Sequence, residues 1–139
     1  MLADGLPAGR DGGRQEHTVS ANAGRLVPVR GRGPIRAIQA RLSYGVRQPD
    51  GSRWEAQAVS YAFRAMDARG VELLVYHLHP WVPNSAFPHL HVYPDPADSR
   101  ITGVHLPTGM VTFGDFVGLL IRDLGVAPLR ADWREVLGL

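Results

Sequence analysis

A regular alternation of apolar and polar side chains runs through the middle of the chain and restricts the folds open to it. In the segment GPIRAIQARLSYGV, apolar residues from Ile38 to Val46 occupy every second position. A repeat of two residues indicates a strand with one buried face. Further segments of strand character follow across turns such as QPDG and DARG, and they cover residues 53–67, 71–79, 89–94 and 101–106. This succession predicts an antiparallel meander of about five strands.

Near the C-terminus the apolar repeat changes from two residues to about 3.6, the period of an amphipathic helix. The repeat runs from Phe113 to Leu124, and Thr112 is a suitable N-cap. A second, shorter helix is expected in the segment RADWREVLGL, where Asp132 and Glu135 have the spacing of a capping box. Strands followed by helices predict an α+β fold with the two C-terminal helices packed on one face of the sheet.

The domain organisation follows from length and composition. A chain of 139 residues has the size of one domain. Residues 1–33 are rich in glycine and arginine and lack apolar periodicity, which predicts a flexible arm before a single α+β domain over residues 34–139. The chain contains no cysteine and no apolar run of the roughly 20 residues that cross a bilayer. We therefore expect a cytoplasmic protein that does not bind a membrane.

The basic side chains are unevenly distributed. All 15 are arginine, and residues 1–53 hold nine of them against four acids, whereas residues 54–139 hold six against nine. Such asymmetry is typical of a protein with a polyanionic partner, and a solvated basic edge is the alternative. Arginine suits phosphate recognition, and an aromatic ring can stack on a base. The candidate residues for binding RNA or another nucleic acid are Arg36, Arg41, Arg64 and Trp81.

Four of the chain's six histidines lie in the stretch VYHLHPWVPNSAFPHLHVYP. They form two His-x-His pairs, His77 with His79 and His89 with His91. Side chains two apart on a strand share a face, and apolar residues occupy the alternate positions of both segments. If the two segments pair as a hairpin with their apolar faces in one core, all four imidazoles gather on the opposite face. The strand register decides whether they meet.

Three hypotheses for the cluster stay open. Neutral imidazoles could hold zinc or another transition metal, with ligands drawn from His77, His79, His89, His91 and His105. The same histidines could instead carry out acid–base chemistry without a metal or other cofactor, with His77, His79, His89 and His91 as the catalytic candidates. Finally, they could be structural residues that bond to loop carbonyls. Both functional hypotheses require imidazoles that converge and remain open to solvent.

A longer stretch around the histidines resembles a known family. Tyr76 begins a Tyr-x-His-x-His sequence at the end of an expected strand, a loop follows, and then comes FPHLH, with an expected helix near the C-terminus. This arrangement is similar to the TumE-type toxins of bacterial toxin–antitoxin pairs. Phe87, Pro88, His89 and His91 match that family's Phe-Pro-His-His-x-His segment, and Leu90 replaces the extra histidine. The resemblance implies a small protein that acts on nucleic acid, with an antitoxin as a protein partner.

The leading functional hypothesis combines the histidines with the basic strand. It is a toxin-like protein that acts on nucleic acid, as a metal-independent ribonuclease in which one histidine takes the 2′-OH proton and another protonates the leaving oxygen. The alternatives are a non-enzymatic module that binds nucleic acid or protein, and a histidine metal-binding protein. Enzymatic and non-enzymatic functions both stay open at this point.

Overall fold

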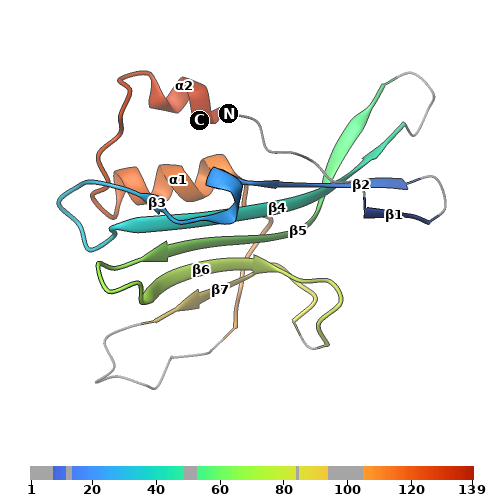
Figure 1. Cartoon of the computed structure of the whole chain (residues 1–139), viewed down its shortest axis with the longest axis horizontal. Helices are drawn as coiled ribbons and strands as arrows, with labels where there is room; N and C mark the ends of the chain where they lie inside the picture. The colour runs from blue at the N-terminus through green and yellow to red at the C-terminus, as the bar shows by residue number, and fades with distance from the viewer. Residues whose placement is uncertain (1–7, 12–13, 49–52, 84, 94–104) are drawn as a thin grey trace.

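The chain folds into one antiparallel sheet followed by two helices, as a computed structural model shows for residues 8–11, 14–48, 53–83, 85–93 and 105–139 (Figure 1). The strands are β1 (Ala8–Asp11), β2 (Arg14–Ser20), β3 (Val27–Pro28), β4 (Ala37–Arg47), β5 (Glu55–Met66), β6 (Glu72–Leu78), β7 (His89–Val92) and β8 (Leu106–Pro107). The helices are the 3-10 turn η1 (Ala21–Gly24), α1 (Phe113–Arg122) and α2 (Trp133–Leu137). The expected α+β fold is confirmed.

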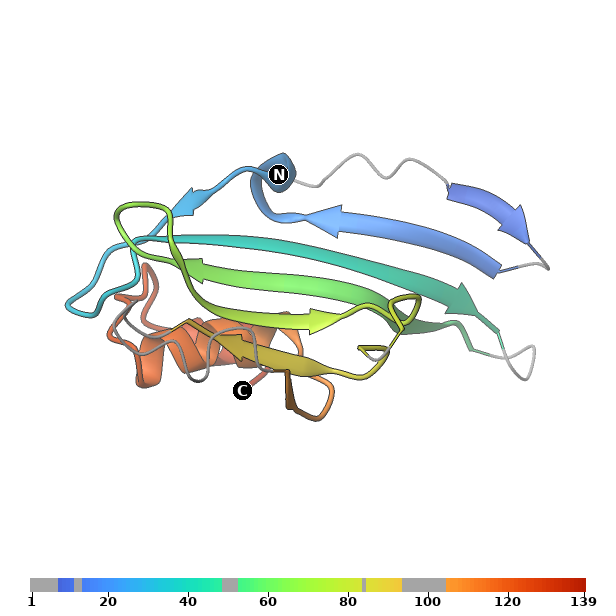
Figure 2. The same cartoon turned by 90° about the horizontal axis from the view of Figure 1, so that it is seen from below.

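All strand pairs in the sheet are antiparallel, and their order is β1-β2-β4-β5-β6-β7-β8, with β3 also paired to β4. From β4 to β8, each strand pairs with the next in sequence, which is the expected meander. The views in Figures 1 and 2 show one continuous, twisted sheet with α1 against it. The strand expected over residues 101–106 lies mostly outside the described residues, and β8 begins at its last position.

The N-terminal segment differs from the flexible arm expected over residues 1–33. Strand β2 pairs with β4 from Gln15↔Val46 to Ser20↔Arg41, and β3 pairs with the beginning of β4. These strands supply little apolar alternation of their own, but β4 is long and would otherwise leave a row of backbone hydrogen-bonding groups unpaired at the sheet edge. The expectation of an arm is therefore corrected for residues 14–28, where backbone pairing outweighs a composition rich in glycine and arginine.

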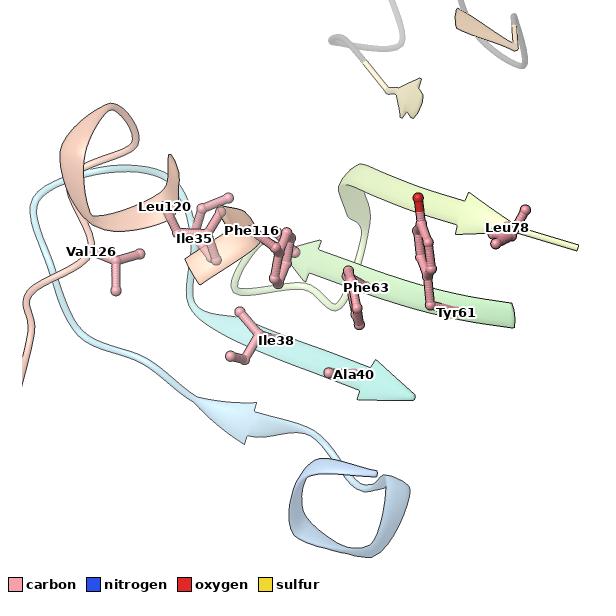
Figure 3. Close-up of a cluster of buried hydrophobic side chains, with 10 residues drawn as sticks. Ile35, Ile38, Ala40, Tyr61, Phe63, Leu78, Phe116, Leu120 and Val126 are labelled. Carbon is pink, nitrogen blue, oxygen red and sulfur yellow. The ribbon is translucent and has the colours of Figure 1, made fainter. Parts of the chain in front are cut away.

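The core lies between α1 and one face of the sheet (Figure 3). Ile38, Phe63 and Phe116 are buried there, and the rings of Phe63 and Phe116 stack with their centroids 5.6 Å apart. Phe63 lies opposite Ala40 in β4 and opposite Tyr76 in β6, so the apolar residues of three neighbouring strands share this face. The other half of the alternation therefore points away from α1.

The two helices differ in how well the sequence predicts their ends. At α1, Thr112 and Asp115 form a full capping box, since the Thr112 hydroxyl accepts from the Asp115 backbone N–H and the Asp115 carboxylate accepts from the Thr112 backbone N–H. At α2, the Asp132 side chain makes no cap hydrogen bond and pairs instead with Arg130 at 2.6 Å. Leu129, which precedes α2, is 99 % exposed. Within the described residues, no helix is long and apolar enough to cross a membrane.

Candidate functional site

The strand register brings the histidines onto one face of the sheet. His77 in β6 lies directly opposite His89 in β7, and Val75 lies opposite His91. In the other direction His77 lies opposite Ala62 of β5, whereas the core residue Phe63 lies opposite Tyr76. The histidines thus occupy the face of the sheet opposite α1, as the alternation of both segments predicts.

Five imidazoles meet on this face, and we call them the histidine cluster: His77, His79, His89, His91 and His105. The ring centroids of His77 lie 4.6 Å from His79, 5.6 Å from His89 and 5.3 Å from His91. His105, just before β8, stacks on His89 at 4.7 Å and meets His91 edge-on at 4.6 Å. Because β8 pairs with β7, the three strands β6, β7 and β8 together build the cluster.

The cluster converges, but its members differ in accessibility. His89 is 1 % exposed and His91 is 8 % exposed, whereas His77 and His79 are half-buried and His105 is exposed. The requirement that the imidazoles remain open to solvent is thus met by His105, met in part by His77 and His79, and not met by His89 and His91. The requirement of solvent access is therefore corrected for a metal site, because metal-binding histidines are commonly enclosed by the protein. It still applies to catalysis on a macromolecular substrate, which a buried imidazole cannot reach.

Several ring nitrogens in the cluster have lone pairs or protons without a partner. Among the described residues, His77 Nε2 and His91 Nδ1 are buried and have no hydrogen-bond partner. Leaving such an atom unpaired costs roughly 1–3 kcal/mol. His89 Nδ1 lies 2.8 Å from the carbonyl oxygen of Phe87 and donates to it, which makes Nε2 the acceptor nitrogen of a neutral His89 ring. One nitrogen from each of His77, His89 and His91 lies within 4.8 Å of the others.

The electrostatic environment lowers the pKa values of His77, His79 and His91 and so favours their neutral form. Burial, followed by the neighbouring imidazoles of His79 and His91, lowers the pKa of His77 from 6.5 to about 3, and Arg64 and His89 contribute further. Burial is also the largest cause that lowers the pKa of His79 and of His91, ahead of repulsion from nearby cationic groups. Imidazoles that do not take up a proton at neutral pH are poor general acids, but they are the form that binds a metal ion.

A cavity of about 280 Å³ adjoins the cluster on the same face of the sheet. Its polar lining comes from Gln39 and Arg41 of β4, Arg64 of β5 and His79, and its other lining residues are Gly24, Ala40 and Ala62. Arg64 donates to the Gln39 amide oxygen at 2.8 Å, and its Nε lies 3.2 Å from a Glu72 carboxylate oxygen. We call this cavity the arginine pocket. His79 belongs to both the arginine pocket and the histidine cluster.

The four candidate nucleic-acid-binding residues divide into two groups. Arg41 and Arg64 line the arginine pocket, and the ring of Trp81, 64 % exposed, lies 5.8 Å from the ring of His79. Arg36 points elsewhere, because its guanidinium donates to the backbone carbonyls of Gly33 and Ile35 just before β4. Three of the four residues therefore lie around His79, and Arg36 stabilises its own loop.

Two residues of the site were missed by the sequence analysis. Gln39 holds Arg64 and donates to the Gly24 carbonyl at 2.6 Å, so it shapes the arginine pocket. Its position in the alternation, two residues before Arg41, was a usable signal. Ser85 is buried in the loop after β6, and its hydroxyl lies 3.2 Å from His105 Nδ1. No sequence pattern indicates this contact, because it depends on the path of a proline-rich loop.

Comparisons with known proteins give no family for the chain: no family model matches it, and no curated protein or solved structure does. The resemblance to TumE-type toxins stays a prediction that rests on the residues of the FPHLH segment. The histidine cluster and the arginine pocket are therefore the features of the molecule that indicate a function.

Proposed function

We propose that this protein binds a divalent transition-metal ion through His77, His89 and His91. The observation that supports the proposal is the convergence of three imidazoles, with one nitrogen of each within 4.8 Å of the others. Two of these histidines carry a buried ring nitrogen without a hydrogen-bond partner among the described residues, and the third has its outer nitrogen bonded to a carbonyl. A metal-binding histidine usually donates its other ring N–H to such an acceptor, which fixes the ring and directs the lone pair inward.

The distances within the cluster are close to those of a metal site. Nitrogen ligands of one tetrahedral zinc ion lie about 3.3 Å apart, since each Zn–N bond is about 2.0–2.1 Å long. The three nitrogens lie within 4.8 Å of one another, so side-chain rotations that move each atom by roughly an ångström bring them into range. Metal binding would also remove the cost of burying two unpaired polar atoms.

The ligand set indicates the class of ion and of chemistry. Imidazole suits zinc, copper, nickel and iron rather than calcium or magnesium. Three protein ligands leave one coordination position for a further molecule, which is the arrangement of catalytic rather than structural zinc sites. When bound, such an ion supplies Lewis-acid chemistry. We therefore propose a small metal-dependent protein of the hydrolase type.

The second candidate is metal-independent cleavage of RNA, and the position of Trp81 beside His79 favours it. In this alternative His79 and His105, the more accessible imidazoles, exchange the protons while Arg41 and Arg64 neutralise phosphate. His77 does not suit the role of general acid, because its pKa of about 3 leaves it neutral at physiological pH. An antitoxin-like protein partner belongs to this candidate.

The decisive experiment is metal retention after dialysis. The purified chain is loaded with zinc, dialysed against metal-free buffer and analysed by elemental mass spectrometry. We expect about one ion per wild-type chain and loss of most of it in His89→Gln, which keeps a polar side chain but no imidazole. His17→Gln is the matched control, because His17 lies on β2, where it stacks on Tyr44 at 5.4 Å and takes no part in the cluster.

The same samples separate the two candidates. Zinc that is not retained, or that is retained equally by His89→Gln, would overturn the metal proposal. RNA cleavage that persists in the presence of a chelator and disappears in His79→Gln would favour the second candidate instead. Far-ultraviolet circular dichroism of each variant distinguishes loss of ligand from loss of fold.

A further inference from the structure

We propose that the arginine pocket binds a small oxyanion, a carboxylate or phosphate group, and that this group is the substrate class of the adjoining histidine centre. The binding itself follows from the pocket. Only its role as a substrate site rests on the metal centre proposed above.

The pocket presents cationic donors from neighbouring strands. Arg41 of β4 is exposed, and among the described residues no hydrogen bond or ion pair engages its guanidinium. Arg64 of β5 lies beside it on the same face, because Arg41 pairs with Ala62 two residues away. Guanidinium groups bind the paired oxygens of carboxylates and phosphates with two parallel N–H donors.

The charge around the pocket is not balanced by the protein. Glu72 pairs with Arg64 at 3.2 Å and offsets one positive charge, whereas Arg41 has no acidic partner among the described residues. Histidine binds a metal ion as a neutral imidazole, so the three proposed ligands would not offset the charge of a divalent ion. An anion in the pocket would therefore balance both the positive charge of Arg41 and that of the proposed metal ion.

The position and size of the pocket fit a small ligand that reaches the centre. His79 lines the pocket, and its ring centroid lies 4.6 Å from that of His77, one of the proposed metal ligands. The volume of about 280 Å³ falls just below the range of about 300–1,000 Å³ usual for small-molecule sites. The pocket thus has space for an oxyanion and a few further atoms, with the histidine centre on one side.

The test is calorimetric titration of inorganic phosphate and, separately, of acetate into the zinc-loaded and the metal-free protein. We expect at least one of the two anions to bind with one site per chain. Arg41→Gln should weaken this binding about tenfold, since it removes a charge-assisted contact. Arg47→Gln is the matched control, because Arg47 lies on the same strand, pairs with Glu55 at 3.4 Å and does not line the pocket. Neither substitution touches a proposed metal ligand, so zinc retention should be unchanged in both.

The outcomes separate the two proposals. Phosphate that binds more tightly than acetate identifies a phosphoryl ligand, and the reverse order identifies a carboxylate. Arg41-dependent binding in a protein that does not retain zinc would support the pocket and overturn the metal centre. If zinc is retained but neither anion binds, or if Arg41→Gln and Arg47→Gln weaken binding equally, the inference about the pocket is wrong while the metal proposal stands.

Discussion

The two faces of the sheet are built from the same strands but serve different purposes. On the face that α1 covers, Phe63 is 1 % exposed and packs against Phe116, so burial there is apolar and well matched. On the opposite face His89 is equally buried, but its neighbours His77 and His91 keep ring nitrogens without hydrogen-bond partners among the described residues. Burial of the aromatic rings stabilises the free protein, whereas burial of unpaired ring nitrogens costs free energy until they gain a partner.

The alternation of a single strand therefore specifies two environments at once, an apolar core on one face and a polar cluster on the other. Tyr76 and His77 are adjacent in β6 and face opposite sides of the sheet. Tyr76 meets Phe116 edge-on at 6.4 Å, whereas His77 lies opposite His89. Large losses of stability should therefore come from changes on the face covered by α1, and losses of ligand binding from changes on the histidine face.

The largest effect is expected on the covered face. Phe63→Ala removes a buried ring at the centre of the core, and such substitutions lower the free energy of unfolding by about 3–5 kcal/mol. Urea denaturation followed by circular dichroism measures the change. At urea concentrations where the variant is still folded, its zinc affinity should be that of the wild type. A loss of zinc from folded Phe63→Ala would show that the two faces are not independent.

The next largest effect is a pH dependence of the protein's stability, and it arises from the histidine face. Below about pH 6.5 the unfolded chain takes up a proton at His77, whereas the folded chain does not do so until about pH 3. The stability of the metal-free protein should thus be complete above pH 6.5 and fall as the pH decreases, by at most about 1.4 kcal/mol per pH unit from this residue. Urea denaturation at a series of pH values measures the slope, which should be smaller in His77→Leu. Equal slopes in the two proteins would contradict the assignment to His77.

Much of this arrangement could be predicted from sequence, because alternation and helical periodicity are local. The gathering of His77, His79, His89 and His91 follows from matching two apolar faces, and Thr112 is recognisable as a cap. The burial of His89 is not predictable, since it depends in part on the ring of His105, which stacks on His89 from beyond the end of β7. Strand β2 was missed because its pairing is supplied by the backbone of β4 rather than by an apolar pattern of its own.

A smaller effect is expected from the helix that covers the core. Thr112→Ala removes the hydroxyl that accepts from the Asp115 backbone N–H, and loss of an N-cap typically costs about 1 kcal/mol. Thermal or urea denaturation should show this loss, with zinc retention unchanged. Thr112→Ser keeps the hydroxyl and serves as the control. If Thr112→Ser is destabilised as much as Thr112→Ala, the cap is not the source of the effect.

The smallest effect has the opposite sign. His77→Leu replaces a buried imidazole that has an unpaired nitrogen with an apolar side chain of similar size, so the metal-free protein should gain up to about 1 kcal/mol of stability. The same variant should lose zinc binding. Denaturation and dialysis of one preparation test both statements. A variant that is destabilised in the absence of metal would indicate that His77 has a structural role instead.

X-ray absorption spectroscopy of the zinc-loaded protein can show whether three histidines of one sheet face hold one metal ion. We expect three imidazole ligands with Zn–N distances of about 2.0–2.1 Å and one further light ligand. In His89→Gln, the number of imidazole ligands should decrease. A zinc ion surrounded by oxygen alone, or an unchanged set of imidazole ligands in His89→Gln, would contradict the proposed metal site.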